Sequence, residues 1–460
     1  MSDNLFIVNI LSLAFLSFFL FKKMFLGSSL KLTRLTLPSF FIVAYIILMS
    51  LPSIKWFYNS THPIRYTYFL AVQSVLISFP LGVLLANVLF LNPYRPYRIV
   101  KDFLYSSLSK TRHDSYMFPF WILMFLSSIL TVTIYILTSD YVPLLGSFVA
   151  YGEMGGEMLR SSIYREPDTI HYAHAMMVRF FLPFCLLYSY FMAYVYKGRW
   201  KYLFWITLLW AMFASLLTFE RVYFFSLFIF LVLAIYFKNN QLISKIHFLS
   251  KSKIRLVIFI LAIMSLAMLV GGIVSRTQYN LPLDLTSIWN TAERFFISRV
   301  LLDPSYMAYI YFEEFNNPST FLYGKSIRLL SLFGVEFHHT VSPSFVAELW
   351  LNFGWFGVLM GTTVIGFILQ FIQLRLFRKK SIPTLSFYII LLLNGAWIIY
   401  GHVLATMVVS VYLLSVLFLF ALQRNRMAGD CRKRGCILQP AGGQRVSGPV
   451  STTGFHDRSA

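Results

Sequence analysis

The chain has 460 residues, of which 58% are hydrophobic and 12% are charged, with a formal net charge of +21. Soluble domains contain roughly 25% charged residues, so the composition excludes a water-soluble globular protein and indicates a membrane protein. The basic residues lie in short loops between apolar runs and form no stripe on one face, which argues against a nucleic-acid binder.

About eleven apolar runs follow one another along the chain, each close to the ~20 residues that cross a bilayer. They predict an all-α, polytopic integral membrane protein with spans at residues 5–21, 37–54, 67–91, 117–138, 179–196, 202–218, 222–237, 256–274, 346–374, 384–401 and 403–422. The first run has no basic segment before it and no small-residue cleavage site after it. It is therefore predicted to be a retained anchor and not a cleaved signal peptide.

Lys and Arg are concentrated in alternate loops. The basic loops are residues 22–34, 95–112, 197–201, 238–255 and 375–380. By the positive-inside rule these loops are cytoplasmic, and the N-terminus lies outside. Two longer loops, residues 139–178 and 275–345, are then left on the outer side, and the second of them is the largest in the chain.

The large outer loop is predicted to contain helices. Asp284 can cap a helix through WNTAERFFISRVL, and Asp303 followed by Pro304 can start another through SYMAYIYFEEF. Both segments have aromatic and aliphatic faces, so the loop is expected to lie on the membrane surface.

The composition changes after Arg426. Residues 1–426 are predicted to form the membrane domain, and residues 427–460, rich in Gly, Ser and basic side chains, a disordered cytoplasmic tail. Cys431 and Cys436 form a lone C-x4-C with no second pair, and the chain has no CxxC pair. The sequence therefore predicts no metal site, cofactor or disulfide framework.

Arg221 stands out among the arginines predicted on the outer side. It lies in a turn too short to be a domain, at the expected N-terminal end of a helix, where the helix dipole opposes a positive charge. A local pair with Glu220 would explain it. Alternatively, its planar guanidinium is held for an anionic partner such as a phosphate, which it can bond through two N–H groups.

Other outer arginines have weaker positional signals. Arg179 is expected at the start of a span, where the dipole again opposes it, and Arg276 at the end of a span, where the dipole favours it. Arg294 and Arg299 belong to a predicted amphipathic loop helix, where snorkelling to lipid headgroups would also explain them.

Polar residues cluster where the large outer loop enters the next span. His338 and His339 are adjacent, so in an extended segment only one is expected to face a site, where imidazole would suit a general base. Glu348 is expected in the first turn of the span, where the helix dipole stabilises a carboxylate.

The residues after Glu348 also differ from a plain lipid anchor. Asn352 is followed by Gly354 and Gly357, a spacing that lets a backbone or a ligand approach closely, and Trp350 and Trp355 suit either the membrane interface or a sugar face.

The chain has no GxxxxGK[ST] sequence, no GxGxxG after a strand and no cytoplasmic loop long enough for a nucleotide-sugar domain. A glycosyl donor, if one is used, must therefore reach the protein within the membrane and already activated.

The stretch HHTVSPSFVAELWLNFGWFGVLMG closely resembles the segment that leads from the large periplasmic loop into the next span of Wzy-type O-antigen and oligosaccharide repeat-unit polymerases. The related O-antigen ligases have a similar order of His, Glu and G-x-x-G. The resemblance extends to the layout of the spans, the dominant outer loop and the outer arginines. It implies a GT-C-like core and metal-independent transfer on the periplasmic face of the bacterial inner membrane.

The resemblance also implies substrates and roles. The substrates would be undecaprenyl-pyrophosphate-linked glycans, and a flippase and a chain-length regulator would be partners. The leaving pyrophosphate would be bound by Arg221 and Arg276, with Arg179, Arg294 and Arg299 as further candidates. His338 or His339 would take the acceptor proton, with Glu348 or Glu336 as alternatives.

Two other functions stay open at this point. An O-antigen ligase would use the same donor with a lipid A core acceptor, and PSFVAELWLNFGW resembles the polymerases more closely. A transporter or flippase for the lipid-linked unit would usually show paired repeats and charges near the middle of the bilayer, whereas the ionisable residues here lie at the ends of spans.

Overall fold

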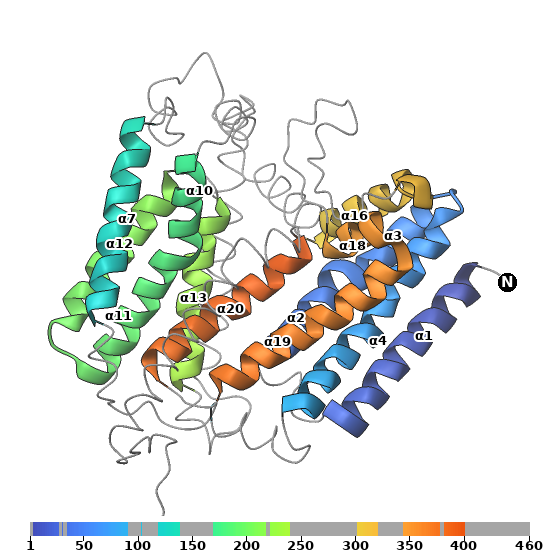
Figure 1. The fold of residues 1–460 in the computed structure, drawn as a ribbon, viewed down its shortest axis with the longest axis horizontal. Coiled ribbons are helices and arrows are strands. Elements are labelled where there is room, and N and C mark those ends of the chain that lie inside the picture. Colours follow the sequence, from blue (N-terminus) through green and yellow to red (C-terminus); the bar gives the residue numbers. More distant parts are fainter. Residues whose placement is uncertain are drawn as a thin grey trace, which may run out of the picture. The chain divides into compact units, whose positions relative to one another are not determined.

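The computed structural model of the chain is all-helical in the part that it describes (Figure 1). The described residues are 3–26, 30, 35–90, 103, 118–138, 169–217, 221–239, 301–320, 344–377 and 381–400. None of these residues forms a strand, which confirms the predicted all-α class. The chain divides into two units, Met1–Ser415 and Val416–Ala460, and every described residue belongs to the first.

The helices follow the apolar runs of the sequence. Their bounds are α1 Asp3–Phe21, η1 Lys22–Leu26, α2 Leu37–Tyr45, η2 Ile46–Ser50, α3 Pro52–Asn59, α4 Ile64–Phe90, α7 Phe118–Thr138, α10 Thr169–Met176, η3 Met177–Phe181, α11 Leu182–Tyr196, α12 Trp200–Leu216, α13 Arg221–Asn239, α16 Asp303–Glu314, η5 Pro318–Thr320, α18 Phe345–Phe356, η6 Gly357–Gly361, α19 Thr362–Leu376 and α20 Ile382–Tyr400. The segments η1, η2, η3 and η6 are π-helical turns, which are rare in proteins and are frequent at functional sites.

By length and composition, six of these helical stretches can cross a membrane. They are Asp3–Leu26, Leu37–Asn59, Ile64–Phe90, Phe118–Thr138, Ala173–Tyr196 and Phe345–Leu376. Three further apolar helices are shorter: Trp200–Leu216, Ser226–Lys238 and Ile382–Gly395. This is the make-up of a membrane-embedded protein. The predicted spans 256–274 and 403–422 lie outside the described residues, so the count of eleven stays a prediction.

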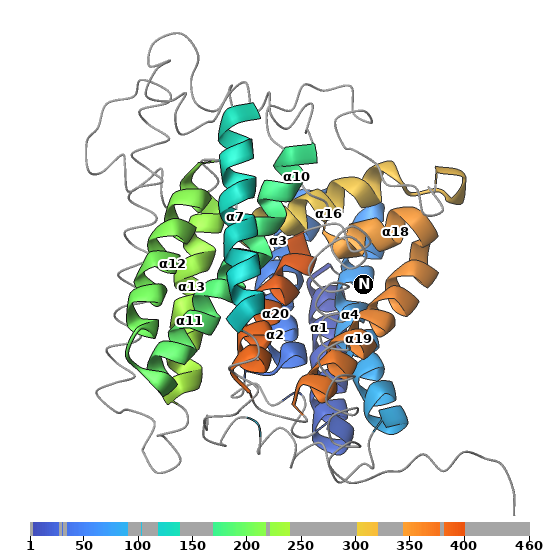
Figure 2. The ribbon, with the colours of Figure 1, turned by 60° about the vertical axis from the view of Figure 1, so that its left-hand side comes forward.

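One group of helices is built around the pair α4 and α19, which lie side by side along their lengths (Figure 2). Two glycines allow this close approach. A Cβ at Gly82 would lie 1.9 Å from the carbonyl oxygen of Thr363, and one at Gly366 would lie 2.3 Å from that of Phe79. Further along the same pair, the Gln370 side-chain amide donates to Asn87 Oδ1 at 2.7 Å. Tight backbone contact and a buried polar bond together hold the two helices in register.

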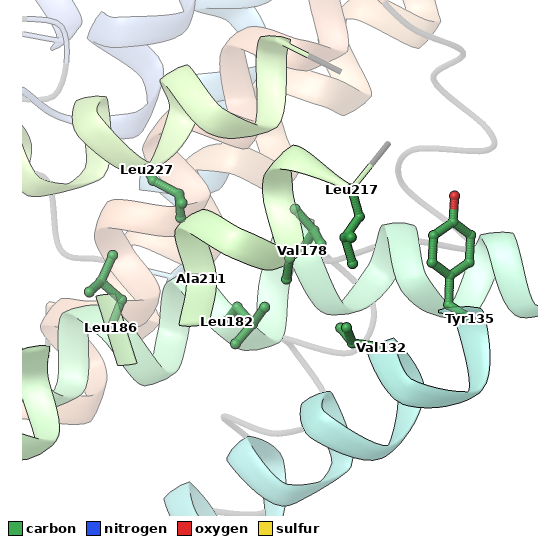
Figure 3. Close-up of a cluster of buried hydrophobic side chains, with 9 residues drawn as sticks. Val132, Tyr135, Val178, Leu182, Leu186, Ala211, Leu217 and Leu227 are labelled. Carbon is green, nitrogen blue, oxygen red and sulfur yellow. The ribbon is translucent and has the colours of Figure 1, made fainter. Parts of the chain in front are cut away.

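A second group consists of α7, α10, α11, α12 and α13, and its core contains a cluster of packed hydrophobic side chains (Figure 3). The cluster contains Val132 and Tyr135 of α7 and Leu182 and Leu186 of α11, and side chains of α12 and α13 complete it. The indole of Trp121 on α7 also donates to the Cys185 carbonyl of α11 at 3.1 Å. α20 contacts both groups, since it packs on α2 and α19 as well as on α11 and α13.

α16, from the loop predicted to be the largest on the outer side, has its apolar face against protein. It packs on α3, α4 and α18, and its buried residues include Met307, Ala308 and Phe312. The sequence predicts this face on the membrane surface. In the structure other helices cover it, which makes α16 a fixed part of the helical assembly.

The start of α16 also differs from the prediction. Leu302 occupies the N-cap position and makes no side-chain cap bond, while Asp303 is already the first helical residue, with Pro304 in the first turn. The cap is displaced because residues 301 and 302 already have helical hydrogen bonding. Asp303 still lies where the helix dipole favours a negative charge.

Candidate functional site around Glu348

Glu348 lies in the first turn of α18, as the sequence predicts. Ser344 caps this helix, since its hydroxyl accepts from the Ala347 amide at 3.3 Å and its carbonyl accepts from the Glu348 amide at 3.0 Å. The Glu348 side chain is only 4% exposed. A carboxylate at this position is stabilised by the amides and the dipole of the helix N-terminus.

α16 lies against this end of α18, where both helices are close in the two views (Figures 1 and 2). Trp350 links the two helices. Its indole Nε1 donates to the carbonyl of Phe315 at 2.8 Å, and its ring stacks on Phe312 with centroids 4.4 Å apart. The Glu348 end of α18 is thereby covered by the C-terminal half of α16.

Tyr311 of α16 lies near Glu348, and the sequence pattern does not indicate this. It is 1% exposed. Burial raises the pKa of the Tyr311 phenol above its ordinary value, and the negative charge of Glu348 raises it further. Tyr311 therefore stays protonated at neutral pH. The signal in the sequence is the run Tyr311, Phe312 and Phe315 on one helix, but nothing in that run indicates which residue faces Glu348.

The glycines after Glu348 shape the backbone. Gly354 has φ 57° and ψ −139°, a conformation essentially restricted to glycine, and it kinks the helix. A Cβ at Gly357 would lie 2.2 Å from the Leu349 carbonyl oxygen, and one at Gly361 would lie 2.4 Å from Leu349 Cδ2. The absence of a side chain at Gly357 thus lets the backbone after the kink approach the backbone before it.

Asn352 and the two tryptophans have different surroundings. The Asn352 side chain is 2% exposed and donates to the Glu348 carbonyl at 2.9 Å, one turn back in the same helix. Trp350 is 4% exposed, whereas Trp355 is 39% exposed and meets Trp350 edge-on at 5.8 Å. Of the two rings, only Trp355 is open to a sugar or to the membrane interface.

The N-terminal half of α16 is attached separately to α4. The Tyr68 hydroxyl contacts Ser305 twice, at 2.8 Å to the carbonyl and 2.6 Å to the side-chain hydroxyl. The Tyr309 hydroxyl also bonds Ser60, in the turn between α3 and α4. The site is therefore built on a helix that is fixed at both ends.

The predicted cationic residues are only partly described. α13 begins at Arg221, so this residue does lie at a helix N-terminus, as predicted. Arg276, Arg294 and Arg299 lie outside the described residues, as do the candidate bases His338, His339 and Glu336. Whether these residues meet Glu348 stays a prediction.

The expected position of Arg179 is wrong. The helix does not start there, because it runs without a break from Thr169 through η3 into α11 and places Arg179 in its third turn. The preceding segment, TIHYAHAM, is helical and belongs to the same continuous helix, although this segment is less apolar than a membrane span. Since dipole effects fall off within the first turn, the helix dipole does not oppose the charge of Arg179. Its side chain is exposed.

Arg65 is an arginine that the sequence analysis does not single out. It forms an ion pair with Asp3 at 2.8 Å and donates to the Ser60 carbonyl at 2.9 Å, and so it joins α1 to the turn before α4. Its guanidinium also lies over the ring of Phe57, 4.9 Å from the centroid. These contacts give Arg65 a structural role.

Within the described ranges, no three His, Cys, Asp or Glu side chains gather closely enough to hold a metal ion. Comparisons of the chain with protein-family models, with curated proteins and with solved structures find no match. The resemblance to Wzy-type polymerases therefore depends on the quoted segment and the layout of spans, and the geometry around Glu348 is independent of it.

Proposed function

We propose that this protein is a membrane glycosyltransferase that joins lipid-pyrophosphate-linked oligosaccharide repeat units into a surface polysaccharide. The reaction would take place on the periplasmic face of the bacterial inner membrane. The observation that best supports the proposal is the position of Glu348. Glu348 lies at the start of a kinked, membrane-length helix, against a helix of the loop that is predicted to lie outside. A lipid-linked substrate would present its pyrophosphate and first sugars at such a junction.

The proposed transfer forms one bond and breaks one bond at the anomeric carbon of the donor. A hydroxyl of the acceptor glycan attacks the anomeric carbon of the donor, the bond from that carbon to the pyrophosphate oxygen breaks, and the carrier pyrophosphate leaves as an anion. The hydroxyl proton passes to a base, His338 or His339, with Glu348 or Glu336 as the alternatives. Arg221 and Arg276, and with them Arg294 and Arg299, would stabilise the charge that develops on the leaving pyrophosphate.

A strain lacking the gene tests the proposal directly. Gel analysis of its surface polysaccharide should show lipopolysaccharide with a single repeat unit, because ligation continues without polymerisation. Core without any repeat unit would instead identify a ligase. Accumulation of the lipid-linked unit on the cytoplasmic leaflet would identify a transporter.

A further inference from the structure

The C-terminal end of α16 is capped by a residue from another helix. α16 ends at Glu314, and the following residue, Phe315, has φ −106° and ψ 55°. Carbonyl groups at a helix C-terminus have no partner within the helix. The indole N–H of Trp350, on α18, supplies the missing donor to the Phe315 carbonyl at 2.8 Å.

The same indole also fixes the rotation of α16. It stacks on Phe312 with an interplanar angle of 19°, and both side chains are buried, at 4% and 0% exposure. Tyr311 is the neighbour of Phe312, and its ring lies parallel to that of Phe315, with the centroids 6.1 Å apart. A donor bond at one residue and a stacked ring one turn earlier fix the rotation of α16 against α18.

We propose that Trp350 is a positioning residue for the Glu348 site, because its bond to Phe315 and its stacking on Phe312 hold the C-terminal half of α16 against the Glu348 end of α18. The role of Glu348 in transfer rests on the proposed function, whereas the capping of α16 does not. Tyr68 and Ser305 anchor the other half of α16 independently. Loss of the indole N–H should therefore loosen residues 311–315 and leave residues 303–308 in place.

Trp350→Phe tests this, since it keeps an aromatic ring and removes the donor. Trp355→Phe is the matched control, because Trp355 is on the same helix, is 39% exposed and is not the residue whose indole donates to Phe315. Hydrogen–deuterium exchange of the purified full chain should show roughly 5-fold faster exchange in residues 311–315 for Trp350→Phe, the loss expected for one hydrogen bond. Phe312→Leu, which removes the stacked ring and keeps the donor, should loosen the same residues.

Kinetics of repeat-unit transfer separate positioning from a general effect on the fold. Trp350→Phe should lower kcat roughly 10-fold with little change in KM, as for an interaction that acts on the chemical step. In a Glu348→Gln background, the same change should add no further loss, because the two residues act as one unit.

Unchanged exchange in both Trp350→Phe and Phe312→Leu would overturn the capping of α16. An undiminished kcat, or an equal further loss in the Glu348→Gln background, would overturn the positioning role. If the wild-type protein transfers no repeat unit at all, the proposed function and the positioning role fail together, and the exchange measurement still decides whether Trp350 caps α16.

Discussion

Glu348 is almost fully buried, although a group that takes a proton from a substrate must touch that substrate. Two functions of the carboxylate are compatible with its 4% exposure: proton acceptance in transfer, or a structural contact with α16. A Gln at this position distinguishes the two functions. The amide has nearly the same shape, but it cannot accept a proton.

If Glu348 accepts the proton in place of His338 or His339, Glu348→Gln should lower the rate of transfer by roughly 10²- to 10⁴-fold, the usual loss when a general base is removed. The bonds of Glu348 to Ser344 and Asn352 use its backbone and should survive, so the thermal stability of the protein should change little. Glu314→Gln, at the exposed end of α16, is the control. A normal transfer rate together with a lower unfolding temperature would assign Glu348 a structural role.

Arg221 begins α13, where the helix dipole opposes its positive charge. Arg221→Lys keeps the charge but loses the planar pair of donors, so severe loss of polymer is expected at normal protein level. A polysaccharide gel measures the chain lengths, and a blot measures the level of the protein. Wild-type chain lengths in an Arg221→Ala strain would remove Arg221 from the mechanism.

Single residues were predictable from the sequence to different degrees. Glu348 was found because its place in the first turn follows from the Ser-Phe-Val-Ala-Glu order. Tyr311 was missed because it comes near Glu348 only through the packing of two helices that are separated in the chain. Arg179 was placed wrongly because polar residues before an apolar run can extend its helix toward the N-terminus.

At the scale of elements, the segment from α18 through η6 to α19 is one apolar run that bends at Gly354. The glycines are visible in the sequence, but a glycine in an apolar run is equally compatible with a straight helix. The positive φ of Gly354 and the contact of Gly357 with the Leu349 carbonyl arise only in the folded protein.

Gly357→Ala should lower stability by about 1–3 kcal/mol, because the new Cβ would lie 2.2 Å from a backbone oxygen that cannot move without shifting α18. Gly361→Ala is the matched control. There the Cβ would meet the end of the Leu349 side chain, which can change rotamer, so a smaller effect is expected. Thermal unfolding in detergent measures both, and equal effects would contradict this account of the kink.

At the scale of the whole molecule, every predicted span within the described residues coincides with a helix, because long apolar runs have few alternatives in a bilayer. The pairing of α4 with α19 was not predictable. Its polar bond joins Asn87 and Gln370, which are 283 residues apart, and neither residue differs in the sequence from other polar residues in spans.

Reporter fusions test the orientation of the whole chain. Fusions after Lys110 and Lys251 should be cytoplasmic, and fusions within residues 147–165 and 316–325 periplasmic, since basic loops stay inside. A fusion between α12 and α13, next to Arg221, should also be periplasmic. A periplasmic signal after Lys251 would place Arg221 on the cytoplasmic side and remove it from the proposed site.

Transfer by the purified protein tests the central proposal most directly. The full chain in liposomes would receive one undecaprenyl-pyrophosphate-linked repeat unit, and the products would be separated by size. A ladder of lipid-linked products with two, three and more repeat units, together with released undecaprenyl pyrophosphate, is the expected result. Movement of the intact unit across the bilayer without a new glycosidic bond would contradict the proposal.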